Sequence, residues 1–150
     1  MGKQKRRVYK LWEESAIPCT IFEITSKQTA QADLTSKYQL YERLGIKEYF
    51  LFDPLDEYLQ PRLQGFILVQ GHYQTLPLSI EGELISRELG LILRPQGDLL
   101  RLVDSYTGQM LATSKEYARQ VESESQRANL AEAKIIELQQ ELERLRRKKN

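Results

Sequence analysis

One acid in an apolar stretch and one lysine in the segment after it are the side chains best suited to chemistry in this sequence. Glu23 lies in the run Thr20–Thr25, whose β-branched and aromatic residues predict a buried strand. Glutamate is seldom fully buried unless it is paired or coordinates an ion. Glu23 is therefore either a solvated residue at a strand end or a metal-binding acid at the rim of a sheet. Lys37, one turn into the helix predicted next, could reach the same rim.

Divalent-metal nucleases use this combination of residue types. Acidic oxygens hold the ion, which activates water and offsets charge at the scissile phosphate, while a lysine orients the nucleophile or stabilises the transition state. Thr25, however, occupies the position where a lysine would share the side of the strand that carries Glu23. Taken alone, one Glu and one Lys favour a structural role, because such a pair occurs in many domains.

The residue counts limit the chemistry further. Cys19 is the one cysteine and His72 the one histidine, which excludes an internal disulfide, a cysteine-based zinc cluster and an obvious nucleophile–histidine pair. Any metal must be held mostly by oxygen, which favours Mg²⁺ or Mn²⁺. Cys19 is interpreted as a small buried residue. The formal net charge of +1 argues against nucleic-acid binding by bulk charge alone.

No segment resembles a targeting signal. The basic N-terminal stretch is followed by no apolar signal-peptide core, and no run is long and apolar enough to span a membrane. These features predict a cytoplasmic protein.

The order of elements predicts a mixed α/β (α+β) fold. A helix is expected from Asp33, interpreted as its N-cap, to a stop at Gly45, and the apolar run "KEYFLFDP" then predicts a second strand. Strand, helix and strand with short connections make the two strands parallel neighbours. After Pro54, short apolar runs separated by glycine-containing turns predict antiparallel hairpins, with a turn at "RPQGDL".

From about Ser114 the chain is charged, favours helix and contains no Gly or Pro. Apolar residues recur with the heptad spacing of a coiled coil, with Glu124 as the exception: Tyr117, Val121, Ala128, Ala131, Ile135, Leu138, Leu142 and Leu145. We therefore expect residues 1–112 to form a globular domain and residues 113–150 a coiled-coil tail, with homo-oligomerisation through the C-terminal helix. The alternative is a single charged helix in solvent.

The run "YKLWEESAIPCTIFEITSKQTAQADLTSKYQLYERLGIKEYFLFDP" resembles the Uma-type family of putative restriction endonucleases. The likeness continues through "LQGFILVQGHYQTLPL" and "SRELGLILRPQGDLLRLVDSYTGQML", and so covers nearly the whole chain. It implies the PD-(D/E)XK, restriction endonuclease-like fold, with a mixed sheet around a strand–helix–strand core. It also implies a metal-dependent endonuclease that hydrolyses DNA phosphodiester bonds.

Carried over residue by residue, the resemblance makes Glu23 the metal ligand and a catalytic residue, with Mg²⁺ or Mn²⁺ as cofactor. Lys37 matches a helix lysine that substitutes for the one absent at Thr25. Asp33 matches a position that is often acidic in the family.

One departure leaves two functions open. In family members a further metal-binding Asp lies on a strand before the region that matches "KRRVYKLWEE", and this chain begins just before that region. The resemblance thus implies either an endonuclease with an impaired site, or a catalytically inactive protein that oligomerises through its tail. The basic stretch Lys3–Arg7 could contact DNA phosphates or form a frayed, solvated end.

Overall fold

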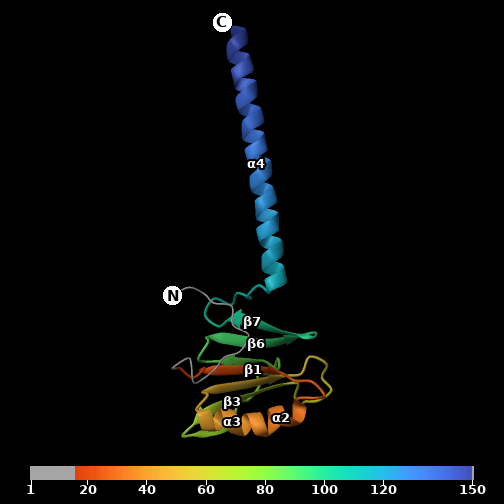
Figure 1. Ribbon diagram of the computed structural model, residues 1–150, viewed down its shortest axis with the longest axis vertical. Helices are drawn as coiled ribbons and strands as arrows, with labels where there is room; N and C mark the ends of the chain where they lie inside the picture. Colours follow the sequence, from red (N-terminus) through yellow and green to blue (C-terminus); the bar gives the residue numbers. More distant parts are fainter. Residues whose placement is uncertain (1–15, 150) are drawn as a thin grey trace. The chain divides into compact units, whose positions relative to one another are not determined.

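The computed structural model describes residues 16–149, which belong to two compact units, one up to Leu111 and the other from Ala112 onward (Figure 1). The first unit contains two sheets and two short helices, and the second contains one long helix. Lys3–Arg7, the predicted phosphate-contacting stretch, lies outside the described residues. None of the helices in residues 16–149 has the length and apolar character needed to cross a membrane.

The central sheet has four strands in the order β1-β2-β3-β4. Strand β1 (Thr20–Ile24) pairs in parallel with β2 (Glu48–Phe52), and the helices α2 (Ala30–Leu34) and α3 (Ser36–Leu44) connect them. This arrangement confirms the predicted strand–helix–strand unit with parallel strands. Strands β3 (Leu63–Val69) and β4 (His72–Thr75) extend the sheet in antiparallel pairing.

The second sheet is antiparallel and has three strands in the order β5-β6-β7. These strands are β5 (Leu84–Ser86), β6 (Leu91–Gln96) and β7 (Leu99–Asp104). The β6–β7 hairpin turns at Gly97, within the predicted "RPQGDL" turn, and Gly97 has the positive φ of 61° that glycine adopts most easily. The prediction of antiparallel hairpins after Pro54 is confirmed.

Strand β2 lies at the centre of three layers and is buried along its whole length. Because side chains alternate along a strand, Tyr49 and Leu51 pack toward Tyr38 and Tyr41 of α3. Phe50 and Phe52 face the other way and pack against Leu84 and Leu93 of the second sheet and their neighbours. Figure 1 shows α2 and α3 on one side of the central sheet and β6 and β7 on the other. The helical layer is the one that positions the candidate site.

A buried carboxylate ties the two sheets together. Glu48, only 1% exposed, begins β2 and accepts hydrogen bonds from the hydroxyl of Ser86 and from the backbone N–H groups of Arg87 and Glu88. These donors replace the water that the charged group loses on burial. Glu48 is therefore explained by the fold.

The helix expected from Asp33 to Leu44 is divided into α2 and α3 at Thr35. The hydroxyls of Thr35 and Ser36 donate to the carbonyls of Gln31 and Ala32, at 2.6 and 3.4 Å. Such side-chain bonds compete with the regular helical ladder. Interpreting Asp33 as the N-cap was wrong, because Thr29 is the cap residue of α2 and Asp33 lies inside that helix.

The fold is mixed α+β, with a mixed sheet around a strand–helix–strand core, and it agrees with the predicted restriction endonuclease-like class. Helix α4 (Ser114–Lys149) begins where the sequence predicted the helical tail.

Candidate active site

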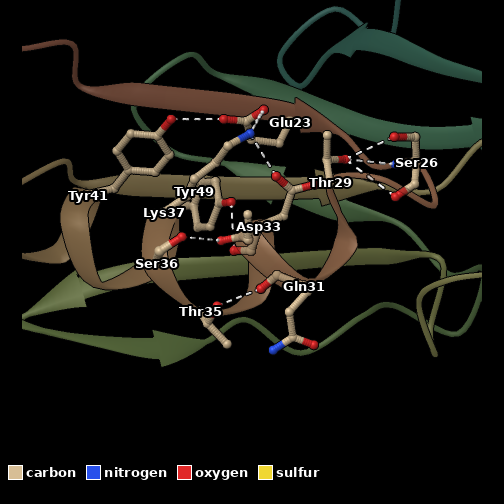
Figure 2. Close-up of polar contacts among 11 residues, drawn as sticks. Glu23, Ser26, Thr29, Gln31, Asp33, Thr35, Ser36, Lys37, Tyr41 and Tyr49 are labelled. Atoms are coloured by element: carbon tan, nitrogen blue, oxygen red, sulfur yellow. Dashed lines mark hydrogen bonds and ion pairs between the residues drawn. The ribbon is translucent and has the colours of Figure 1, made fainter.

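Three charged side chains lie together where the helical layer meets strand β1 (Figure 2). The ammonium Nζ of Lys37 lies 2.9 Å from Oε2 of Glu23 and 2.8 Å from Oδ1 of Asp33. Glu23 comes from β1, Asp33 from α2 and Lys37 from α3. One lysine therefore joins two carboxylates that are ten positions apart in the sequence.

The two carboxylates differ in their access to solvent. The side chain of Glu23 is 21% exposed, whereas that of Asp33 is fully buried. Within residues 16–149, the second oxygen of Asp33, Oδ2, has no hydrogen-bond partner. A buried carboxylate oxygen normally has one, because burial without a partner costs free energy. Asp33 thus differs from Glu48, whose buried carboxylate accepts several hydrogen bonds.

Lys37 remains charged in this setting. Partial burial by itself lowers the pKa of an ammonium, but the hydrogen bonds to Asp33 and then to Glu23 outweigh it, so the pKa of Lys37 lies above its ordinary value. The cluster therefore combines two carboxylates with one ammonium. It can attract a cation, and its lysine can meet negative charge on a substrate.

Two tyrosines hold the carboxylate-bearing elements in place. The hydroxyl of Tyr41 donates to Oε1 of Glu23 at 2.8 Å, and the hydroxyl of Tyr49 donates to the backbone carbonyl of Asp33 at 2.9 Å. Burial and, next, the hydrogen bond to Glu23 raise the pKa of Tyr41 to about 12. Burial similarly raises the pKa of Tyr49. Both hydroxyls thus stay protonated near neutral pH and act as donors.

The connection from β1 to α2 is a turn held by local hydrogen bonds. The backbone N–H of Ser26 donates to the hydroxyl of Thr29 at 3.0 Å, and their two hydroxyls lie 3.2 Å apart. Local bonds of this kind are why Ser and Thr favour turns. The tight turn brings the start of α2 back beside the end of β1.

The structure brings together the two residues that the sequence singled out, Glu23 and Lys37, and Lys37 reaches the strand end as expected. Thr25, two residues after Glu23, is buried, and its hydroxyl has no hydrogen-bond partner within the described part of the chain. Cys19, interpreted as buried, is instead exposed, because it precedes the edge strand β1.

Asp33 and Tyr41 are the members of the site that the sequence did not identify. Asp33 was interpreted as a helix cap, although it matches a position that is often acidic in the family, and Tyr41 was not singled out. A signal was nevertheless present, because residues 33, 37 and 41 follow one another at the four-residue spacing that places side chains on one helical face. The spacing survives the break at Thr35, as the Lys37–Asp33 ion pair demonstrates.

The donors in the cluster suit a hard cation. Mg²⁺ is usually bound through one or two carboxylates, with water and substrate phosphate completing its shell, and Glu23 and Asp33 supply two carboxylates. Within residues 16–149 there is no group of three or more His, Cys, Asp or Glu side chains that could hold a metal. The set therefore holds too few ligands for a protein-only cage, and an ion there would rely on water and phosphate for its other ligands.

Comparison with known protein families gives a match. The family model Uma2, described as a putative restriction endonuclease, matches residues 2–96, which is more than half of the chain and includes all members of the cluster. No curated protein matches the sequence.

Proposed function

The chain belongs to the Uma2 family of putative restriction endonucleases, and we propose on that basis that it is a metal-dependent endonuclease that hydrolyses DNA phosphodiester bonds. The observation that carries the proposal is the Glu23–Lys37–Asp33 cluster, in which both ion-pair distances are below 3 Å. The family supplies the class of reaction, and the cluster supplies the residue types that this reaction needs.

In the proposed site, Glu23 and Asp33 are the residues that would hold Mg²⁺ or Mn²⁺. When bound, such an ion lowers the pKa of a water molecule and offsets negative charge on the scissile phosphate. Asp33 is the second carboxylate of the cluster, and its Oδ2 has no hydrogen-bond partner within residues 16–149, although the side chain is fully buried. Glu23 is suited because its side chain is partly exposed and can be reached by a substrate.

Lys37 is the proposed electrostatic catalyst. Its ammonium is partly exposed and permanently charged near neutral pH, so it can bind a phosphate oxygen as negative charge develops there. Tyr41 is a positioning residue, since it holds Oε1 of Glu23 and leaves Oε2 to face Lys37.

The test is nicking of supercoiled plasmid DNA with Mg²⁺ or Mn²⁺, using the full chain. We expect Glu23→Gln and Lys37→Met to abolish nicking. The matched controls are Glu88→Gln and Lys47→Met, because Lys47 and Glu88 form a 2.8 Å ion pair outside the cluster. Nicking that persists in Glu23→Gln, or that is lost equally in the control variants, would overturn the assignment.

A second candidate is a catalytically inactive protein that acts through self-association. The observation that favours it is that Lys37 already neutralises part of the charge that would draw a cation to Glu23 and Asp33. The same assay distinguishes the two functions. A chain that self-associates but neither nicks DNA nor gains thermal stability from Mg²⁺ or Mn²⁺ would support this second function.

A further inference from the structure

Helix α4 leaves an apolar seam exposed, which Glu124 interrupts. The helix is 36 residues long, and all of its side chains from Ser114 to Arg147 whose burial is described are at least partly exposed. The larger apolar residues of the seam are between 49% and 64% exposed: Tyr117, Val121, Ile135, Leu138, Leu142 and Leu145. Most helical stability in proteins comes from packing an apolar face rather than from helix propensity, so a partner for this seam is expected.

We propose that a second copy of the same chain covers the seam, and that the two α4 helices form a parallel, in-register, two-stranded coiled coil. This inference is independent of the proposed endonuclease activity. In heptad notation, Val121, Ala128, Ile135 and Leu142 occupy a positions, while Ala131, Leu138 and Leu145 occupy d positions. The heptad with Ile135 at a and Leu138 at d combines a β-branched residue with Leu, which favours two strands in a parallel arrangement.

The charges beside the seam fit a second parallel copy. In a parallel pair, each g residue faces the e residue five positions later on the partner. Arg127 then faces Glu132, and Glu141 faces Arg146, so both pairs attract. The other two g–e pairs, Gln120 with Ser125 and Lys134 with Gln139, contain no like charges.

Antiparallel pairing brings like charges together in both registers that overlap most of the seam. In one register, Lys134 faces Lys134 of the second copy. In the other register, Arg127 faces Lys134 of the second copy, and Glu132 faces Glu132 of the second copy. Like charges opposite each other in this way disfavour an orientation. Parallel pairing also has one unfavourable layer, because Glu124 at a d position faces Glu124 of the second copy. A substitution at this position therefore tests the proposal.

Sedimentation equilibrium of the full chain should reveal a reversible species of twice the 17.6 kDa chain mass. Ile135→Glu should weaken dimerisation at least about tenfold, because it places a charge inside the seam. The control is Ile136→Glu, since this neighbour is 55% exposed, against 54% for Ile135, but lies outside the seam. A chain that stays monomeric, or equal effects of the two substitutions, would overturn the proposal.

Glu124→Leu tests the assigned seam. Removing the facing carboxylates should tighten the dimer at least about tenfold, whereas Glu122→Leu, the same change at an outward b position, should have little effect. If Glu122→Leu tightens association as much as Glu124→Leu does, the assigned seam is wrong.

Cross-linking tests the orientation directly. In a Cys19→Ser background, which removes the exposed native thiol, Leu142→Cys should be joined efficiently by a short bis-maleimide. In the antiparallel registers the two introduced thiols would be more than about 25 Å apart, at 1.5 Å per residue. A dimer by sedimentation that gives no such cross-link would overturn the parallel arrangement.

Discussion

Lys37 and Asp33 form a 2.8 Å ion pair across the break between α2 and α3, with the aspartate fully buried and the lysine partly exposed. The pair therefore links the two short helices to each other, and through Glu23 it links them to β1. Its position at the centre of the cluster means that the same contacts serve stability and the proposed chemistry. These two contributions can be separated experimentally.

A double-mutant cycle on Asp33 and Lys37 should reveal their coupling. Asp33→Asn leaves the ammonium short of one partner, and Lys37→Met leaves a buried carboxylate unpaired, so each should lower the free energy of unfolding. We expect the double variant to lose less than the sum of the two, with a coupling of roughly 0.5–3 kcal/mol. Urea denaturation at neutral pH gives the free energy of unfolding of the wild type, the two single variants and the double variant. Additive losses would mean that the ion pair contributes no net stability.

Tyr41→Phe should change how stability depends on alkaline pH. The pKa of Tyr41 is raised to about 12 in the folded chain, whereas an unfolded tyrosine titrates near about 10. The folded state thus keeps this proton after the unfolded state has lost it. The stabilisation is present below about pH 10 and is lost as the pH rises toward about 12.

The measurement is the free energy of unfolding of both proteins from about pH 9 to pH 11.5, a range set by the tyrosine pKa values. As the pH rises, the free energy of unfolding of the wild type should fall more steeply than that of Tyr41→Phe. Comparing the two proteins removes the contribution of Tyr49 and Tyr73, whose pKa values burial also raises. Parallel curves would place the Tyr41 hydroxyl outside the hydrogen bond with Glu23.

Asp53→Ala should destabilise the fold without involving the site. Asp53 is buried directly after β2 and accepts backbone hydrogen bonds from Leu55, Glu57, Tyr58 and Leu59. Losing this acceptor leaves several donors unsatisfied, and we expect a loss of at least about 2 kcal/mol. Glu57→Ala, at an exposed position of the same loop, is the control and should change stability by less than about 0.5 kcal/mol.

The same aspartate should make the wild type sensitive to acid. Burial alone would raise the pKa of Asp53, but the backbone hydrogen bonds, led by that from Tyr58, lower it overall. Its stabilisation is therefore present above the unfolded pKa of about 4 and is lost as the pH falls below that value. Asp53→Ala should lose this part of the acid dependence. If its stability falls with acid as steeply as that of the wild type, another carboxylate is responsible.

The sequence predicted the strands and the long helix well, because these elements carry strong periodic signals. The apolar run of β2 and the spacing that leads to Gly45 at the end of α3 required no tertiary information. The break at Thr35 was hidden, because the four-residue spacing continues through it while two hydroxyls replace the helical bonds. Local side-chain bonds of this kind do not alter hydrophobic periodicity.

The site was predictable in part for a related reason. Glu23 was conspicuous as an acid in an apolar strand, and Lys37 was within reach of it. Asp33 resembled an ordinary helix cap, and only the packing of α2 against Tyr49 and Lys37 shows that its side chain is buried. The carboxylate of Glu48 is equally buried but has several hydrogen-bond donors, so burial of an acid does not by itself identify a site.

The most direct test of the proposed metal centre is a titration of the full chain with Mn²⁺, followed by the loss of the free-ion paramagnetic resonance signal. The account predicts one bound ion per chain, displaced by excess Mg²⁺, because Glu23 and Asp33 together form one site for a hard cation. Binding should be lost in Glu23→Gln and retained in Glu88→Gln. A wild-type chain that binds no Mn²⁺, or binding that survives Glu23→Gln unchanged, would contradict the account.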